Sequence, residues 1–247
     1  MLARIKAIAG DVGFYYKNLV TGETVTYQED LPLIAASVIK LPMMVEAFRQ
    51  FDAGELNPDE LYIVQDIGKV PSCGVLTYLH DGLAVTIRDL VVLSIIVSDN
   101  TATNLLMDLL GIDSVNALLD TLDMPTTRLR RKMFDREAAS RGLQNTITAG
   151  EIGGLLEKLY WGNLISPVAS GQMIQILKDQ QLESKMPFRF TDSIEIAHKT
   201  GEDTGTTHDV GIVYARNPFV ICFCSNNVDT PAFERVMQDI TWELAHE

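Results

Sequence analysis

Three short groups of residues along the chain carry side chains that could cooperate in one covalent reaction. They are Ser37-Val-Ile-Lys40, Ser98-Asp-Asn100 and Lys199-Thr-Gly201. A hydroxyl is a poor nucleophile until a neighbouring group takes its proton. A lysine three residues after a serine that opens a helix lies on the same helical face, so Lys40 is within reach of Ser37. Together the groups supply a nucleophile, two proton carriers and a cation for an anionic part of a substrate.

The three groups differ in how specific they are. A Ser-x-x-Lys pattern is expected about once by chance in a chain of this length. Each of the other two tripeptides is expected in roughly a few chains in a hundred. Because all three occur here in 247 residues, a shared site is favoured over an unrelated set of helix, loop and strand residues.

The composition indicates a folded protein that is unlike those that bind nucleic acids or anionic membranes. With 47% hydrophobic residues, the chain can bury a substantial core. It carries 33 acidic and 20 basic residues, for a net charge of −13. A field of that sign repels nucleic acids and anionic membrane surfaces, and no segment is long and apolar enough to span a bilayer. We therefore expect no nucleic-acid or membrane partner. The three groups of residues lead us to expect a small-molecule substrate, and we also expect a monomer.

The N-terminus and the cysteines bear on location and cofactors. The first ten residues predict a short amphipathic helix rather than a secretory signal, so we expect a cytoplasmic protein, or a secreted one whose signal has been removed. Cys222 and Cys224 alternate along an apolar strand and are expected to be small buried residues, whereas Cys73 is interpreted as incidental. Four histidines and three cysteines show no ligand spacing, so a metal site is not expected.

Strand-like segments stand at both ends of the chain, and helical patterns fill the middle. The predicted strands cover 12–20, 24–27, 193–200, 207–215 and 219–225, with a break at 201–205. The predicted helices cover 34–51, 86–97, 101–110, 114–122, 148–159, 167–179 and 231–245. The fold class is therefore mixed α/β, with an antiparallel sheet built from both termini and flanked by helices, beside an all-helical lobe. We expect one domain over 1–247, with an α/β lobe from 1–30 plus 191–247 and a helical lobe from 31–190.

This layout and the three groups together resemble the class A β-lactamases and the penicillin-binding proteins. The resemblance covers essentially the whole chain from Gly13 onward. It extends to Ser-Asp-Asn-Thr-Ala-Thr-Asn-Leu-Leu at 98–106 and to Gly-Thr-Thr-His-Asp at 205–209. It implies the fold of β-lactamases and DD-peptidases, and a serine hydrolase that opens a β-lactam amide without a cofactor.

The resemblance assigns catalytic roles to the first two groups. Ser37 forms the acyl-enzyme, and Lys40 takes its proton directly or through water. That role requires a partly neutral lysine, and Lys199 is a second cation that would favour the neutral state. Ser98 relays a proton to the leaving group, and Asn100 holds the substrate amide.

The third group is expected to bind the substrate. Lys199 and Thr200 would hold a substrate carboxylate. The resemblance places the oxyanion hole on the backbone N–H groups of Ser37 and of Glu202, the residue that follows Gly201.

Other polar residues near these groups are given supporting roles. Asp99 is expected to brace its loop through backbone hydrogen bonds. Strand alternation places His198 on the face opposite Lys199, so we interpret it as a packed residue. His208-Asp209 lacks the arrangement that a Ser-His-Asp triad needs. Thr206, Thr207 and His208 are left as candidates for substrate specificity.

One feature of the resembled family is missing. Class A β-lactamases carry Glu-x-x-Leu-Asn in a loop after the second group, and its glutamate activates the deacylating water. Residues 130–145 contain no such sequence, and a gap-free comparison places Met133 or Phe134 at the glutamate position. Asp135 is the candidate substitute base and Glu137 the next, although Asp135 could equally cap a short helix. Acylation is expected to be intact and deacylation slow.

Three functions remain open at this point. The first is a β-lactamase-type serine hydrolase, and the second is an esterase or peptidase on the same scaffold. The third is an acylatable penicillin-binding or sensor protein with little turnover. A turnover assay separates the first function from the third, and a panel of esters separates the first from the second.

Overall fold

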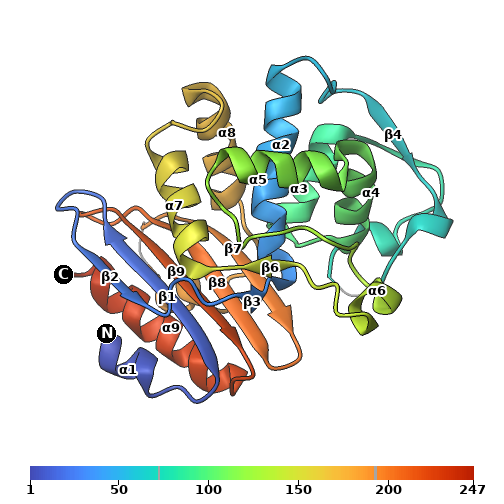
Figure 1. Cartoon of the computed structure of the whole chain (residues 1–247). Coiled ribbons are helices and arrows are strands. Elements are labelled where there is room, and N and C mark those ends of the chain that lie inside the picture. Colours follow the sequence, from blue (N-terminus) through green and yellow to red (C-terminus); the bar gives the residue numbers. More distant parts are fainter. Residues whose placement is uncertain (72, 192–193) are drawn as a thin grey trace.

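Both ends of the chain build one antiparallel sheet in the computed structural model, which describes residues 1–71, 73–191 and 194–247. The strand order is β2-β1-β9-β8-β7, with β7 at one edge. The strands are β1 (Asp11–Asn18), β2 (Thr24–Tyr27), β7 (Ile196–Asp203), β8 (Thr206–Val213) and β9 (Phe219–Asn226). Figure 1 shows the blue N-terminal hairpin beside the orange and red C-terminal strands. The predicted mixed α/β fold class is confirmed.

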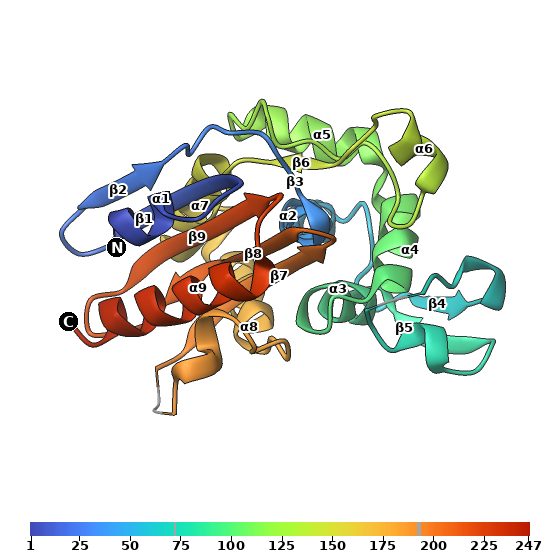
Figure 2. The same cartoon turned by 90° about the horizontal axis from the view of Figure 1, so that it is seen from below.

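Alternation along the strands separates two hydrophobic cores. The odd-numbered residues of β9 from Phe219 to Phe223 face α1 (Leu2–Lys6) and α9 (Thr230–Ala245). Figure 2 shows α9 lying across this face of the sheet. Cys222 and Cys224 face the opposite core, where both are buried, as the sequence predicts.

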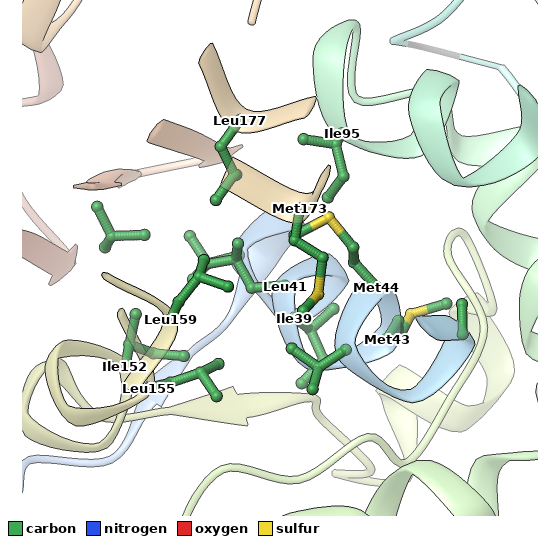
Figure 3. Close-up of a cluster of buried hydrophobic side chains, with 14 of the residues drawn as sticks. Ile39, Leu41, Met43, Met44, Ile95, Ile152, Leu155, Leu159, Met173 and Leu177 are labelled. Carbon is green, nitrogen blue, oxygen red and sulfur yellow. The ribbon is translucent and has the colours of Figure 1, made fainter. Parts of the chain in front are cut away.

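The opposite core is organised around α2 (Lys40–Asp52), a helix with ten of its thirteen residues buried. Such a helix packs on all sides instead of presenting one apolar stripe. Figure 3 shows Leu41, Met43 and Met44 of this helix gathered with side chains from α3, α7 and α8. The other helices in this part are α3 (Ile87–Ile96), α4 (Asn100–Leu110), α5 (Ile112–Thr121), α6 (Arg136–Ser140), α7 (Ala149–Tyr160) and α8 (Pro167–Lys178). Within the described ranges, no helix is both long and apolar enough to cross a membrane.

The helix predicted over 34–51 begins later than expected. Leu33–Ile34 form β3, which pairs with β6 (Thr146–Ile147), and Ala36–Ile39 form the 3₁₀ turn η1. Ala36 has a φ of 43°, a left-handed conformation that does not continue into a right-handed helix. The serine of the first group therefore lies on a turn before the helix.

Two further features of the fold differ from the prediction, namely an additional hairpin and a shorter turn between two strands. A small hairpin of β4 (Leu61–Val64) and β5 (Leu83–Thr86) interrupts the helical middle, with the turns η2 (Asp66–Gly68) and η3 (Leu76–Tyr78) between its strands. The break predicted at 201–205 is shorter, because β7 stays paired with β8 to its end at Asp203. Gly205, at a φ of 65°, supplies the turn. The predicted start of β7 at Ser193 lies outside the described residues.

Two adjacent glycines in α7 provide a matched test of its packing on the sheet. A Cβ at Gly153 would lie 2.3 Å from Cδ1 of Tyr15, whereas a Cβ at Gly154 would meet nothing within 4 Å. We expect Gly153→Ala to lower the free energy of unfolding by about 1–3 kcal/mol through overpacking. We expect Gly154→Ala to raise it by up to about 1 kcal/mol through helix propensity. Urea denaturation measures both changes, and equal effects would contradict close packing at Tyr15.

Candidate active site

Ser37 lies on the turn η1, which neighbouring strands hold in place. The Ile34 N–H donates to Asn226 Oδ1 at 2.8 Å, and His208 Nε2 donates to the Ile34 carbonyl at 2.8 Å. The Ala35 N–H donates to the Asn145 carbonyl at 2.8 Å. In the described part of the chain, the Ser37 hydroxyl forms no hydrogen bond with Lys40 or any other residue, and it faces a cleft. The serine is therefore fixed through its backbone, and its hydroxyl is available to a substrate.

Lys40 is the first residue of α2 and is fully buried. Its side-chain nitrogen lies within hydrogen-bond distance of three oxygen atoms. Nζ lies 2.8 Å from the Ser98 carbonyl, 3.0 Å from Ser98 Oγ and 2.9 Å from Asn100 Oδ1. Burial, and then the charge of Lys199, hold the pKa of Lys40 well below its ordinary value. These effects favour the neutral amine that a proton acceptor must be.

The contacts of Lys40 determine how the protons are shared. A neutral amine has two N–H donors and one lone pair, whereas the Ser98 carbonyl and Asn100 Oδ1 can only accept. If these two oxygens take both donors, the third contact runs from the Ser98 hydroxyl to the lone pair of Lys40. Lys199 Nζ donates to the same hydroxyl oxygen at 3.1 Å. Ser98 thus connects the two lysines in one proton path.

Lys199 reaches this path from β7 and is also fully buried. Its ammonium donates a second hydrogen bond to the Thr200 carbonyl at 2.9 Å. Burial, followed by the charge of Lys185, lowers the pKa of Lys199 to about 7. Lys199 is therefore a weaker cation near neutral pH than a surface lysine.

Asp99 holds the loop that forms one wall of the site. Its Oδ1 accepts from the Ala102 N–H at 2.9 Å and caps α4, while Oδ2 accepts from the N–H groups of Val75 and Leu76 at 2.7 and 2.8 Å. Gly74 has a φ of 110°, and a Cβ there would lie 2.3 Å from Asp99 Cγ. Only glycine fits at this position. These contacts agree with the bracing role predicted for Asp99.

The edge strand β7 passes directly beside the turn that carries Ser37. A Cβ on Gly201 would lie 2.9 Å from His208 Cδ2 and 3.1 Å from Val38 Cγ2. The absence of a side chain at Gly201 therefore allows the two backbones to approach. Thr200 and Glu202 both line the cleft beside this contact.

A third buried lysine, missed by the sequence analysis, lies against β7. Lys185 Nζ donates to the carbonyls of Gly201 and His208 at 3.2 and 3.1 Å. It also pairs with Glu202 Oε1 at 3.1 Å. Lys185 precedes the short turn η4 (Met186–Arg189) in a segment with no regular hydrophobic period, so nothing in its spacing marks it.

His198 packs with Asp209 behind the site, as the sequence analysis expected. His198 Nδ1 and Asp209 Oδ1 lie 2.8 Å apart, and Asp209 Oδ2 accepts from the Met186 N–H at 3.0 Å. Both side chains are buried. No hydrogen bond joins either of them to Ser37 within the described residues, so the structure contains no Ser-His-Asp arrangement there.

His208 is a clamp between β9 and the serine turn. The Ser225 N–H donates to Nδ1 of His208 at 3.0 Å, so the ring proton must be on Nε2, which donates to Ile34. Burial lowers the pKa of His208 to about 4, which keeps the ring neutral. Thr207 donates to Glu234 on α9 and Thr206 accepts from Asn226. These three side chains make structural contacts, and none of them is among the residues that line the cleft.

A cleft of about 930 Å³ opens over these groups. It is lined by candidate site residues from all three motifs, namely Ser37, Ser98, Asn100, Thr200 and Glu202. Lys40, Lys199 and Gly201 are buried below them. No cluster of three or more potential metal ligands occurs among the described histidine, cysteine and acidic residues.

The segment 131–136 forms another wall of the cleft, where the family's glutamate is missing. Asn104 on α4 holds this wall, donating to the Met133 carbonyl at 3.0 Å and accepting from its N–H at 2.8 Å. Asp135 lines the cleft, but its Oδ1 accepts from the Ala138 N–H at 2.8 Å and caps α6. Glu137 pairs with Arg141 and is not among the lining residues.

The fold and the site together define a serine hydrolase that has lysines, rather than a histidine, next to its serine. The chain belongs to the β-lactamase enzyme family, whose model matches residues 2–246.

Individual relatives agree with this assignment. A β-lactamase from Rhodobacter capsulatus is 27% identical over 86% of this chain and 73% of its own length. A β-lactamase from Streptomyces fradiae is 28% identical over 89% of this chain and 72% of its own. The crystal structure of a β-lactamase from Sphaerobacter thermophilus superposes with a TM-score of 0.91 at 34% identity, covering 97% of this chain and 92% of that one.

A penicillin-binding protein, PBP-A, shares the fold. It superposes with a TM-score of 0.88 at 23% identity, covering 98% of this chain and 91% of its own. A variant of PBP-A, solved as an acyl-enzyme complex with penicillin G, gives a TM-score of 0.85 at 24% identity over 95% of this chain and 89% of that one.

The buried His208 predicts a specific acid sensitivity. Its folded pKa of about 4 lies below the ordinary 6.5, so the unfolded chain binds the proton first as the pH falls. The stability associated with the neutral ring is complete above pH 6.5 and is lost toward pH 4. Between pH 7 and pH 4, we expect the wild type to lose about 3 kcal/mol more unfolding free energy than His208→Asn. The same measurement on the exposed His80→Asn should follow the wild type, and parallel loss in all three proteins would contradict the clamp.

Proposed function

We propose that this protein opens β-lactam amides through an acyl-enzyme on Ser37 and releases the acyl group slowly. The observation that carries the proposal is the sharing of Ser98 by two buried lysines beside a serine whose hydroxyl faces the cleft. Membership in the β-lactamase family supports the reaction class.

In the proposed acylation, Ser37 Oγ attacks the lactam carbonyl carbon while its proton passes to neutral Lys40, directly or through a water molecule. The backbone N–H groups of Ser37 and Glu202 would stabilise the oxyanion. The C–N bond then breaks, and the leaving nitrogen takes the Ser98 hydroxyl proton. Lys40 returns a proton to Ser98, so both groups regain their starting states.

Recognition would use groups that the proton path leaves available. Asn100 accepts from Lys40 through Oδ1, which leaves its Nδ2 donors for a substrate amide. Lys199 has one donor beyond its contacts to Ser98 and Thr200, and with the Thr200 hydroxyl it would hold a substrate carboxylate.

Slow deacylation is proposed because the wall at 131–136 presents Met133 and Phe134, one of which stands where the resembled family carries a carboxylate, and neither side chain can act as a base. Asn104 holds the Met133 backbone in place. Asp135 lines the cleft, but one of its oxygens is used as a helix cap. A deacylating water would therefore lack a dedicated base.

The first test is covalent labelling of Ser37. After brief exposure to penicillin G, we expect the intact mass of the wild type to rise by one acyl group and peptide mapping to place that group on Ser37. Ser37→Ala should remain unlabelled because it has no nucleophilic oxygen. Equal labelling of the two proteins would contradict the assignment of Ser37.

The second test separates acylation from deacylation. Stopped-flow hydrolysis of a chromogenic cephalosporin should show a burst near one equivalent followed by a slow steady rate. Met133→Glu should raise the steady rate at least tenfold, because it places a carboxylate on the clamped wall. If Asp135 is a substitute base, Asp135→Asn lowers the steady rate and keeps the burst. A burst-free wild type with the rate of an efficient enzyme would disprove slow deacylation.

A further inference from the structure

We propose that the Glu202 side chain occupies Lys185 as an internal competitor, so that a carboxylate on the leaving-group side of an acyl donor gains no contact from Lys185 beyond the hold of Lys199 and Thr200. This inference rests on the proposed acyl transfer at Ser37 and concerns which acyl donors the site selects. The oxyanion role of Glu202 belongs to its backbone N–H, whereas the competition belongs to its carboxylate.

The donor count at Lys185 is the first support. An ammonium group has three N–H donors. Two of them meet the carbonyls of Gly201 and His208, and the third meets Glu202 Oε1 at 3.1 Å. Lys185 is fully buried, whereas the Glu202 side chain is 58% exposed. The carboxylate therefore lies between the cation and the open cleft, and no donor remains for a substrate.

The position of this pair along β7 is the second support. Thr200 and Glu202 are two residues apart on a strand, so their side chains leave the same face. Lys185 contacts the carbonyl of Gly201, the residue between them. A substrate carboxylate held by the Thr200 hydroxyl would therefore be next to the position that Glu202 already fills.

The remaining charges along this side of the cleft do not replace Lys185. Glu183 and Asp203 line the same cleft and add negative charge. Lys199 has a single donor to offer, and burial lowers its pKa to about 7. Arg131 and Arg136 line the cleft from the separate segment 131–136. A carboxylate-bearing donor must displace Glu202 in order to reach Lys185, whereas a neutral donor has no need of that cation.

The test uses two ester donors that differ only in the leaving hydroxy acid, which carries either a free carboxylate or the corresponding carboxamide. The readout is the ratio of their second-order rate constants for acylation of Ser37, carboxylate over carboxamide. We expect Glu202→Gln to raise this ratio at least tenfold, because glutamine is isosteric but lacks the negative charge that neutralises Lys185. Asp203→Asn removes the same charge from the neighbouring residue without touching Lys185 and should change the ratio less than threefold.

A second variant tests whether Lys185 is the released cation. Adding Lys185→Met to Glu202→Gln should abolish the gain in the ratio. If that double variant does not fold, the contrast between Glu202→Gln and Asp203→Asn decides alone. An unchanged ratio in Glu202→Gln, or an equal rise in Asp203→Asn, overturns the inference. Failure of every donor to acylate the wild type would instead overturn the proposed function.

Discussion

Lys40 and Lys199 place their side-chain nitrogens 3.0 and 3.1 Å from a single oxygen, Ser98 Oγ, and in the described chain no carboxylate forms an ion pair with either lysine. Two ammonium groups in such surroundings disfavour each other's charge, and burial adds to that cost. The rest of the fold supplies the rigidity that holds them there. Lys40 stands at the start of the buried helix α2, and Lys199 stands on strand β7 of the main sheet. Ser98 has a left-handed backbone conformation and precedes α4.

The sequence was sufficient for the groups that carry the chemistry and for most of the elements that hold them. The positions of Ser98, Asn100 and Lys199 could be predicted from local sequence. A strand pattern surrounds Lys199, a helix cap lies beside Ser98 and Asn100, and the three groups occur in the order of the resembled family. Lys185 could not, because its importance arises from contacts with Gly201 and His208, which local sequence does not encode. The late start of α2 was missed for a similar reason. The Ile34 backbone is fixed by partners far along the chain, and these override a helical pattern.

At Met133, the cleft wall is held by backbone hydrogen bonds, and the side chain is left to line the cleft. Asn104 satisfies both the N–H and the carbonyl of Met133, so the course of this backbone is held by contacts that do not involve the Met133 side chain. In the proposed function, a change of that side chain would alter the release of an acyl group while these backbone contacts remain. A close superposition with a β-lactamase at a TM-score of 0.91 is therefore compatible with a different balance between acylation and release.

The tethering of the serine turn also has a consequence during synthesis. Ile34 is held by Asn226 and His208, which follow it by 192 and 174 residues. A ribosome delivers residues from the N-terminus onward, so Ile34 and Ser37 emerge long before Asn226 and His208. While the chain grows, Ser37 lacks both Lys199 and the neighbouring edge of β7. The arrangement of Ser37 with Lys199 and β7 can form only when nearly the whole polypeptide has been made. Any reactivity of Ser37 that depends on this arrangement therefore appears only when folding is almost complete.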